Sequence, residues 1–110
     1  IGGFETDDMT FHSRQHVVEQ RLKAWLSGDP NGVRRAALSL FLQHGDLTIE
    51  DVYERLAPTY PVSYHGVGGM IGLISSRIGI LQGIRDDKRR CRSYRLREKD
   101  RASVREIMTA

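Results

Sequence analysis

Apolar residues recur every three or four positions over much of the chain, a spacing that predicts amphipathic helices. Gly28 and Pro30 are expected to end the first helix, Gly45 to follow the second and Gly79 to end the fourth. The predicted helices span residues 11–26, 31–44, 48–57 and 63–78. Their apolar positions and one strand residue predict a core of Leu22, Trp25, Leu38, Phe41, Val52, Leu56, Val67, Ile71, Ile74, Ile78 and Leu96.

Polar residues in front of the apolar repeats predict where the helices begin. Asn31 and Ser63 are expected to be N-caps, because their side-chain oxygens can accept hydrogen bonds from exposed backbone N–H groups. Thr48 precedes Asp51 by three residues, which is close to a capping box. The third helix is expected to end by Ala57, since a residue before proline is disfavoured in the α region.

After Gly79 the apolar period changes from helical to two, which predicts a β-hairpin. Ile80, Gln82 and Ile84 follow this period before a polar tip at residues 86–90. In the second strand, Arg92, Tyr94 and Leu96 alternate with Cys91, Ser93, Arg95 and Arg97. A last helix is expected to start at Asp100 or Ser103. These elements predict a mobile segment at 1–10, one domain at 11–98, and a helix or tail at 99–110.

Length and composition limit the class of protein. A chain of 110 residues with 39% hydrophobic and 28% charged residues is typical of one soluble domain. The longest apolar stretch, residues 67–80, is shorter than the roughly 20 residues that cross a bilayer, and the start of the chain lacks the pattern of a secretory signal. Cys91 is the single cysteine, which excludes disulfide scaffolds and multi-cysteine zinc sites. We expect a cytoplasmic protein.

Positive charge is concentrated at the end of the chain. Residues 1–84 hold 7 lysines and arginines against 9 acidic residues, whereas residues 85–110 hold 10 against 5. A nearly neutral body with a basic C-terminal quarter is typical of a surface that binds a polyanion.

Helices joined by short turns and followed at once by a basic hairpin make the stretch 17–98 resemble a winged helix-turn-helix domain. The fold class we predict is therefore mainly α with a C-terminal β-hairpin. The resemblance implies that residues 63–78 form the recognition helix, 48–57 the helix before it, and 80–96 the wing. The runs 63–72 and 75–81 also resemble a small archaeal winged-helix family of unknown function.

The resemblance and the charge together predict the residues that bind double-stranded DNA. Arginines in a hairpin gain affinity by displacing counterions and by forming paired hydrogen bonds with phosphate oxygens. On the predicted recognition helix few side chains can read bases, and the strongest is Arg77 because it can pair with guanine. Two arginines also lie in the first turn of the second helix, where phosphate is favoured. The predicted set is Arg34, Arg35, Tyr64, His65, Ser76, Arg77, Lys88, Arg89, Arg90, Arg92, Arg95 and Arg97.

Several alternatives stay open. The glycines at 66–72 permit close approach either of DNA or of another helix. The predicted function is binding of double-stranded DNA by a homodimer in transcription regulation or chromatin, and the alternatives are a protein-interaction module and an RNA binder. His12 and His16 lack a third metal ligand nearby, and no nucleotide-binding or nucleophile motif is present, so we expect no enzyme, cofactor or metal.

Overall fold

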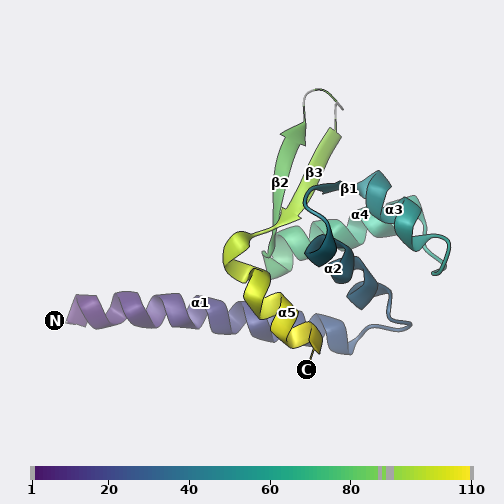
Figure 1. The fold of residues 1–110 in the computed structure, drawn as a ribbon. Coiled ribbons are helices and arrows are strands. Elements are labelled where there is room, and N and C mark those ends of the chain that lie inside the picture. The colour runs from purple at the N-terminus through teal and green to yellow at the C-terminus, as the bar shows by residue number, and fades with distance from the viewer. Residues whose placement is uncertain (1, 87, 89–90, 110) are drawn as a thin grey trace.

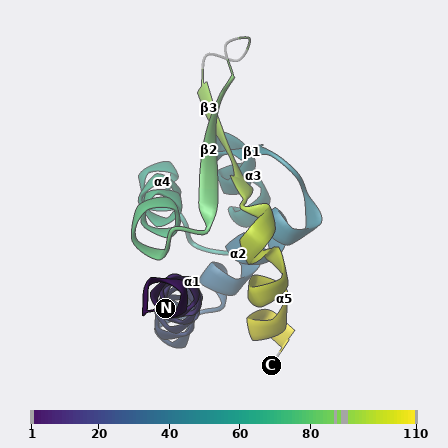
Figure 2. The ribbon, with the colours of Figure 1, turned by 90° about the vertical axis from the view of Figure 1, so that its left-hand side faces the viewer.

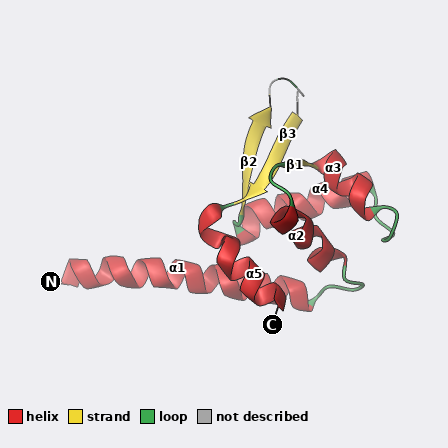
Figure 3. Cartoon of the chain, viewed as in Figure 1, coloured by secondary structure: helices red, strands yellow, loops and turns green. Residues whose placement is uncertain are grey.

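A computed structural model describes residues 2–86, 88 and 91–109 (Figure 1). The predicted fold class is confirmed, because helices make up most of the chain and a small antiparallel sheet lies near its C-terminal end (Figure 3). The elements are α1 (Gly2–Ser27), α2 (Val33–Gln43), β1 (Leu47–Thr48), α3 (Ile49–Leu56), α4 (Tyr64–Leu73), β2 (Leu81–Asp86), β3 (Cys91–Leu96) and α5 (Arg101–Thr109). A π-helical turn, Ile74–Ile78, continues α4, and a 3₁₀ turn, Glu98–Asp100, leads into α5.

The predicted hairpin is present, and we call β2 and β3 together the wing. It is antiparallel, with Leu81 opposite Leu96 at its base and Asp86 opposite Cys91 near its tip. The predicted alternation that begins at Ile80 is wrong, because the strand starts one residue later, so that Ile80 and Leu81 are both buried. β1 was not predicted, since two residues are too short to show a period, and it adds a third strand along β3.

The buried core joins all the helices to the base of the sheet. Every residue of the predicted core is buried except Trp25, which is half-buried and packs against it. The indole of Trp25 is instead covered by the Arg34 guanidinium, 5.2 Å from the ring centroid. The core also includes Val18, Leu26, Ala37, Leu47, Ile80, Leu81 and Val104.

Two predicted helix boundaries are wrong. α1 begins at Gly2 rather than at residue 11, because a helix can extend beyond the apolar repeat that packs against the core. Asn31 is not the N-cap of α2: Gly32 is, with φ 86°, and the Asp29 carboxylate accepts hydrogen bonds from the Arg34 and Arg35 N–H groups at 3.1 and 3.2 Å. At the other end of α2, His44 is the C-cap, so Gly45 follows the helix as predicted.

The caps of α3 and α4 are as predicted. Thr48 Oγ1 accepts from the Asp51 N–H and the Asp51 carboxylate accepts from the Thr48 N–H, both at 3.0 Å, so the capping box is complete. Ser63 Oγ accepts from the Gly66 N–H at 3.0 Å. α3 ends at Leu56 as expected, although Ala57 keeps right-handed helical angles of φ −56° and ψ −37° despite the proline that follows.

The wing projects from one side of the molecule, and α1 and α5 lie on the opposite side in both views (Figures 1 and 2). α5 packs against α1 and α2, and its Val104 is fully buried. The N-terminal part of α1 extends past the rest of the chain (Figure 1). No helix in the described part of the chain combines the length and apolar character needed to span a membrane.

Candidate nucleic-acid interface

One face of α4 is uncovered. Val67 and Ile71 on its inner face are fully buried, whereas His65, Gly69 and Gly72 on its outer face are exposed. A Cβ atom built on Gly69 or Gly72 would meet nothing within 4 Å, so packing inside the described chain does not require either glycine. Because a helical glycine costs about 1 kcal/mol relative to alanine, this stripe of bare backbone has no explanation within the domain.

The N-terminus of α4 and the wing meet at a small cleft. Tyr64, the first residue of α4, and Arg92 on β3 both line it. The rest of the lining comes from Thr48, Ile49, Glu50, Cys91 and Tyr94. The Tyr64 ring is half-exposed and makes an edge contact with Tyr53, with ring centroids 6.0 Å apart. Tyr64 and Arg92, which the sequence predicted as DNA-binding residues in separate parts of the chain, therefore lie on one surface.

The charge at this cleft is mixed. Arg92 is exposed, and within residues 2–86, 88 and 91–109 its side chain forms no ion pair or hydrogen bond. Glu50 is exposed in the first turn of α3 and lines the same cleft. It was not predicted as part of the site, although its place beside the capping Thr48 is visible in the sequence. A carboxylate there opposes phosphate, so Glu50 is expected to weaken binding of a polyanion.

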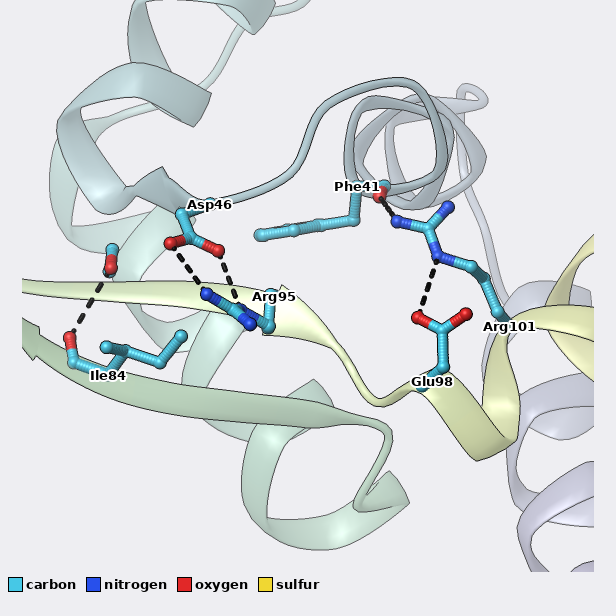
Figure 4. Close-up of polar contacts among 7 residues, drawn as sticks. Phe41, Asp46, Ile84, Arg95, Glu98 and Arg101 are labelled. Atoms are coloured by element: carbon cyan, nitrogen blue, oxygen red, sulfur yellow. Dashed lines mark hydrogen bonds and ion pairs between the residues drawn. The ribbon is translucent and has the colours of Figure 1, made fainter.

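Arg95 is also exposed, but its charge is already paired. Its Nε and Nη2 atoms donate to the two carboxylate oxygens of Asp46 at 2.7 and 3.0 Å (Figure 4). This hydrogen bonding, together with the negative charge of Asp46, raises the pKa of Arg95. The pair joins β3 to the loop between α2 and β1. Asp46 could not be predicted as a partner, because 49 residues separate it from Arg95 in sequence.

Arg97 does not lie on the wing. It follows the end of β3, its side chain is half-buried, and its backbone N–H donates to the Ile80 carbonyl at 2.8 Å. The prediction that Arg95 and Arg97 share an exposed strand face is therefore wrong, because the strand ends at Leu96. A few residues on, Arg101 donates to the Leu42 carbonyl at 3.0 Å and to the Phe41 carbonyl at 3.5 Å, the second of which Figure 4 shows, and so joins α5 to the C-terminus of α2.

Arg34 and Arg35 are engaged on the side of the molecule away from the wing. Arg34 Nη1 donates to the Trp25 carbonyl at 2.7 Å, and Arg35 Nη1 donates to the Met108 carbonyl at 3.2 Å. These bonds join α2 to α1 and to α5. The structure therefore does not bring either arginine together with the cleft.

Ser76 and Arg77 lie at the other end of the predicted recognition helix, in the π-helical turn that continues α4. Thirteen residues of helix, roughly 20 Å, separate Arg77 from Tyr64. Arg21 of α1 donates to the Arg77 carbonyl at 3.1 Å, and Ser76 Oγ donates to the Gly72 carbonyl within the helix at 2.7 Å. Lys88 is exposed at the tip of the wing. Arg89 and Arg90, which were also predicted, lie outside the described residues.

Comparisons with known proteins agree with this fold. Residues 22–104 match the family described as "Protein of unknown function (DUF2551)". An uncharacterised protein from Archaeoglobus fulgidus is 37% identical over 92 residues, which cover 83% of this chain and 92% of that protein. Both findings confirm the resemblance to an archaeal family of unknown function.

Two solved structures are similar in fold. A MarR family protein from Bacillus stearothermophilus has a TM-score of 0.58 at 18% identity, covering 97% of this chain and 72% of that one. MepR, described as a transcription regulator of the Staphylococcus aureus multidrug efflux pump MepA, has a TM-score of 0.56 at 17% identity, covering 94% and 72%. Neither description names an enzyme. The predicted winged-helix fold is confirmed by these similarities.

Proposed function

The chain belongs to the DUF2551 family, and we propose that it binds double-stranded DNA through its winged helix and regulates transcription. The observation that carries this proposal is the cleft at which Tyr64 of the recognition helix meets Arg92 of the wing. Because helix and wing meet there, an exposed arginine with no ion pair in the described structure lies beside the first residue of α4. A duplex can contact both at once.

The two parts of this surface are suited to different tasks. Arg92 and the Tyr64 hydroxyl offer donors to phosphate oxygens, which position a duplex without reading its sequence. The outer face of α4 and of the π-helical turn that continues it offers His65, Ser76 and Arg77 as side chains that can reach bases, and the glycines between them allow the helix backbone to approach the groove closely. We therefore expect binding in which affinity for phosphate exceeds discrimination between sequences.

The proposed consequence of DNA binding is regulation of transcription. It is supported by the similarity in fold to MepR, which is described as a transcription regulator. A homodimer is part of the same proposal, since operators with two half-sites mirror the two-fold symmetry of a protein dimer. α1 extends past the body, and Val17 on it is 40% exposed although it is apolar, which supports α1 as the surface for a second copy (Figure 1).

Fluorescence anisotropy of the full chain with labelled random duplexes, at salt concentrations between 50 and 300 mM, tests DNA binding. We expect unrelated duplexes to bind alike and the logarithm of the binding constant to fall linearly with the logarithm of salt. Arg92→Ala should weaken binding, whereas Arg105→Ala, which removes the same charge from exposed α5, should not. Absence of duplex binding at the lowest salt overturns the proposal, and binding confined to RNA or to an acidic protein favours those alternatives.

Sedimentation equilibrium tests the dimer. We expect the wild-type chain to be a dimer and Val17→Glu to shift it toward monomer, because a charge would enter the interface. Gln20→Glu is the matched control, since Gln20 is also exposed on α1 and is already polar. A wild-type monomer at every concentration would show that α1 has no second copy to pack against.

A further inference from the structure

Gly83 and Arg92 lie side by side on one face of the wing. In the hairpin register Arg92 is directly opposite Arg85, and Gly83 is directly opposite Tyr94. Gly83 is therefore the diagonal cross-strand neighbour of Arg92, one step closer to the base of the wing. Diagonal neighbours on one face are within reach of a long side chain.

The Arg92 side chain occupies the space where Gly83 has no side chain. A Cβ atom built on Gly83 would lie 2.9 Å from Cδ of Arg92, and 3.6 Å from its Cγ and Nε. A carbon–carbon approach of 2.9 Å is too short to be tolerated, since such contacts are optimal at about 3.5–4.0 Å. The aliphatic stem of Arg92 thus rests directly on the bare backbone of β2.

Backbone conformation does not account for the glycine. Among the described glycines only Gly32 and Gly79 have a positive φ, so the strand angles at Gly83 are open to any residue. Glycine in a strand interior weakens the strand and often marks a close approach by another group. The close approach at Gly83 is that of Arg92.

The charges on this face favour the same arrangement. Arg85 and Arg92 are directly opposite, and like charges in that position repel each other. By lying over Gly83, the Arg92 side chain turns away from Arg85 toward the base of the wing.

We propose that Gly83 is a positioning residue for DNA binding: it lets the Arg92 side chain lie across β2, where its guanidinium is held ready for a phosphate of the duplex. This inference rests on the proposed function. An Arg92 side chain that already rests on β2 loses less conformational freedom on binding DNA than a mobile one. Its contact with a phosphate therefore forms at a smaller entropic cost.

The test is Gly83→Ala, studied in the full chain by anisotropy with random duplex and by thermal unfolding. The added methyl meets only a flexible side chain, so we expect an unchanged or slightly higher melting temperature. It displaces Arg92, and one lost phosphate contact lowers the log–log salt slope by about 0.9, which corresponds to about fivefold weaker binding at 0.15 M salt. Gly45→Ala is the matched control, because a Cβ there meets nothing within 4 Å.

A double variant shows whether Gly83 acts through Arg92. If it does, Gly83→Ala combined with Arg92→Ala binds no more weakly than Arg92→Ala alone. Wild-type affinity and slope in Gly83→Ala, or additive losses in the double variant, overturn the inference while leaving the proposed function intact.

A measurement that needs no DNA distinguishes failure of the positioning role of Gly83 from failure of the proposed function. ¹⁵N relaxation of the Arg92 Nε is expected to report an ordered side chain in the wild type and a mobile one in Gly83→Ala. Should the wild type bind no duplex, the proposed function fails and the relaxation data alone decide whether Gly83 positions Arg92. Equal mobility in the two proteins overturns the positioning role.

Discussion

Arg92 and Arg95 provide the sharpest comparison for DNA binding, because both are exposed arginines on β3, three residues apart. Replacing either with alanine removes one positive charge from the wing. If total charge determined affinity for a duplex, the two variants would behave alike. The structure predicts that they differ, because Arg95 is paired with Asp46 and Arg92 has no such partner among the described residues.

The expected sizes follow from these contacts. Arg92→Ala should lose one phosphate contact, which lowers the salt slope by about 0.9 and the affinity at 0.15 M salt by about fivefold. Arg95→Ala should leave the slope nearly unchanged, since both carboxylate oxygens of Asp46 already accept from its guanidinium at 2.7 and 3.0 Å. The side chains of Arg95 and Asp46 are 51% and 42% exposed, so losing the pair should lower the free energy of unfolding only slightly.

Anisotropy titrations of both variants between 50 and 300 mM salt, with urea denaturation alongside, provide the measurements. Asp46→Asn is the companion variant: it removes the carboxylate charge and releases Arg95, so binding should stay equal or become tighter. A slope that falls as far in Arg95→Ala as in Arg92→Ala would show that the ion pair opens on DNA. The assignment of Arg95 to a structural role would then be wrong.

Four further outcomes test the fold and the site. Leu38→Ala should lower the free energy of unfolding by about 2–5 kcal/mol in urea denaturation, because the side chain is fully buried, and a loss below about 1 kcal/mol would contradict its place in the core. Thr48→Ala should cost about 1 kcal/mol in the same assay by removing half of the capping box, while Thr109→Ala at the end of α5 should cost less. Glu50→Gln should tighten duplex binding in the anisotropy assay, since it removes a negative charge from the cleft beside Arg92; weaker binding would place the duplex elsewhere. Cys91→Ser should leave the sedimentation mass unchanged without reductant, because the thiol is exposed and forms no disulfide in the chain, and a smaller mass would reveal an intermolecular bridge.

The two ends of the recognition helix raise a separate question about specificity. Tyr64 is at the cleft, whereas Arg77 is beside α1, and Arg21 holds the Arg77 carbonyl at 3.1 Å. A π-helical turn ends the helix there, and such turns occur often at functional sites. That Arg77 reads a base stays a prediction; a duplex that reaches it must extend along most of α4.

The sequence by itself determined the local elements. Periodicity of apolar residues located α2, α3, α4 and the hairpin, and short polar signals located two of their caps, the Thr48–Asp51 box and Ser63. These features depend on residues within about four positions of one another, so the local sequence is enough to predict them. The same reason explains why the buried faces of the long helices were predicted well.

Only the tertiary structure decided which charged residues are available to a ligand. From composition, the arginines of the C-terminal quarter were equivalent, yet Arg95 is paired with Asp46, Arg97 is half-buried beyond the strand, and Arg92 lies over Gly83. Each of these outcomes depends on a group that is distant in sequence or across a strand pair. A charge acts through its distance to other charges, and that distance exists only once the chain has folded.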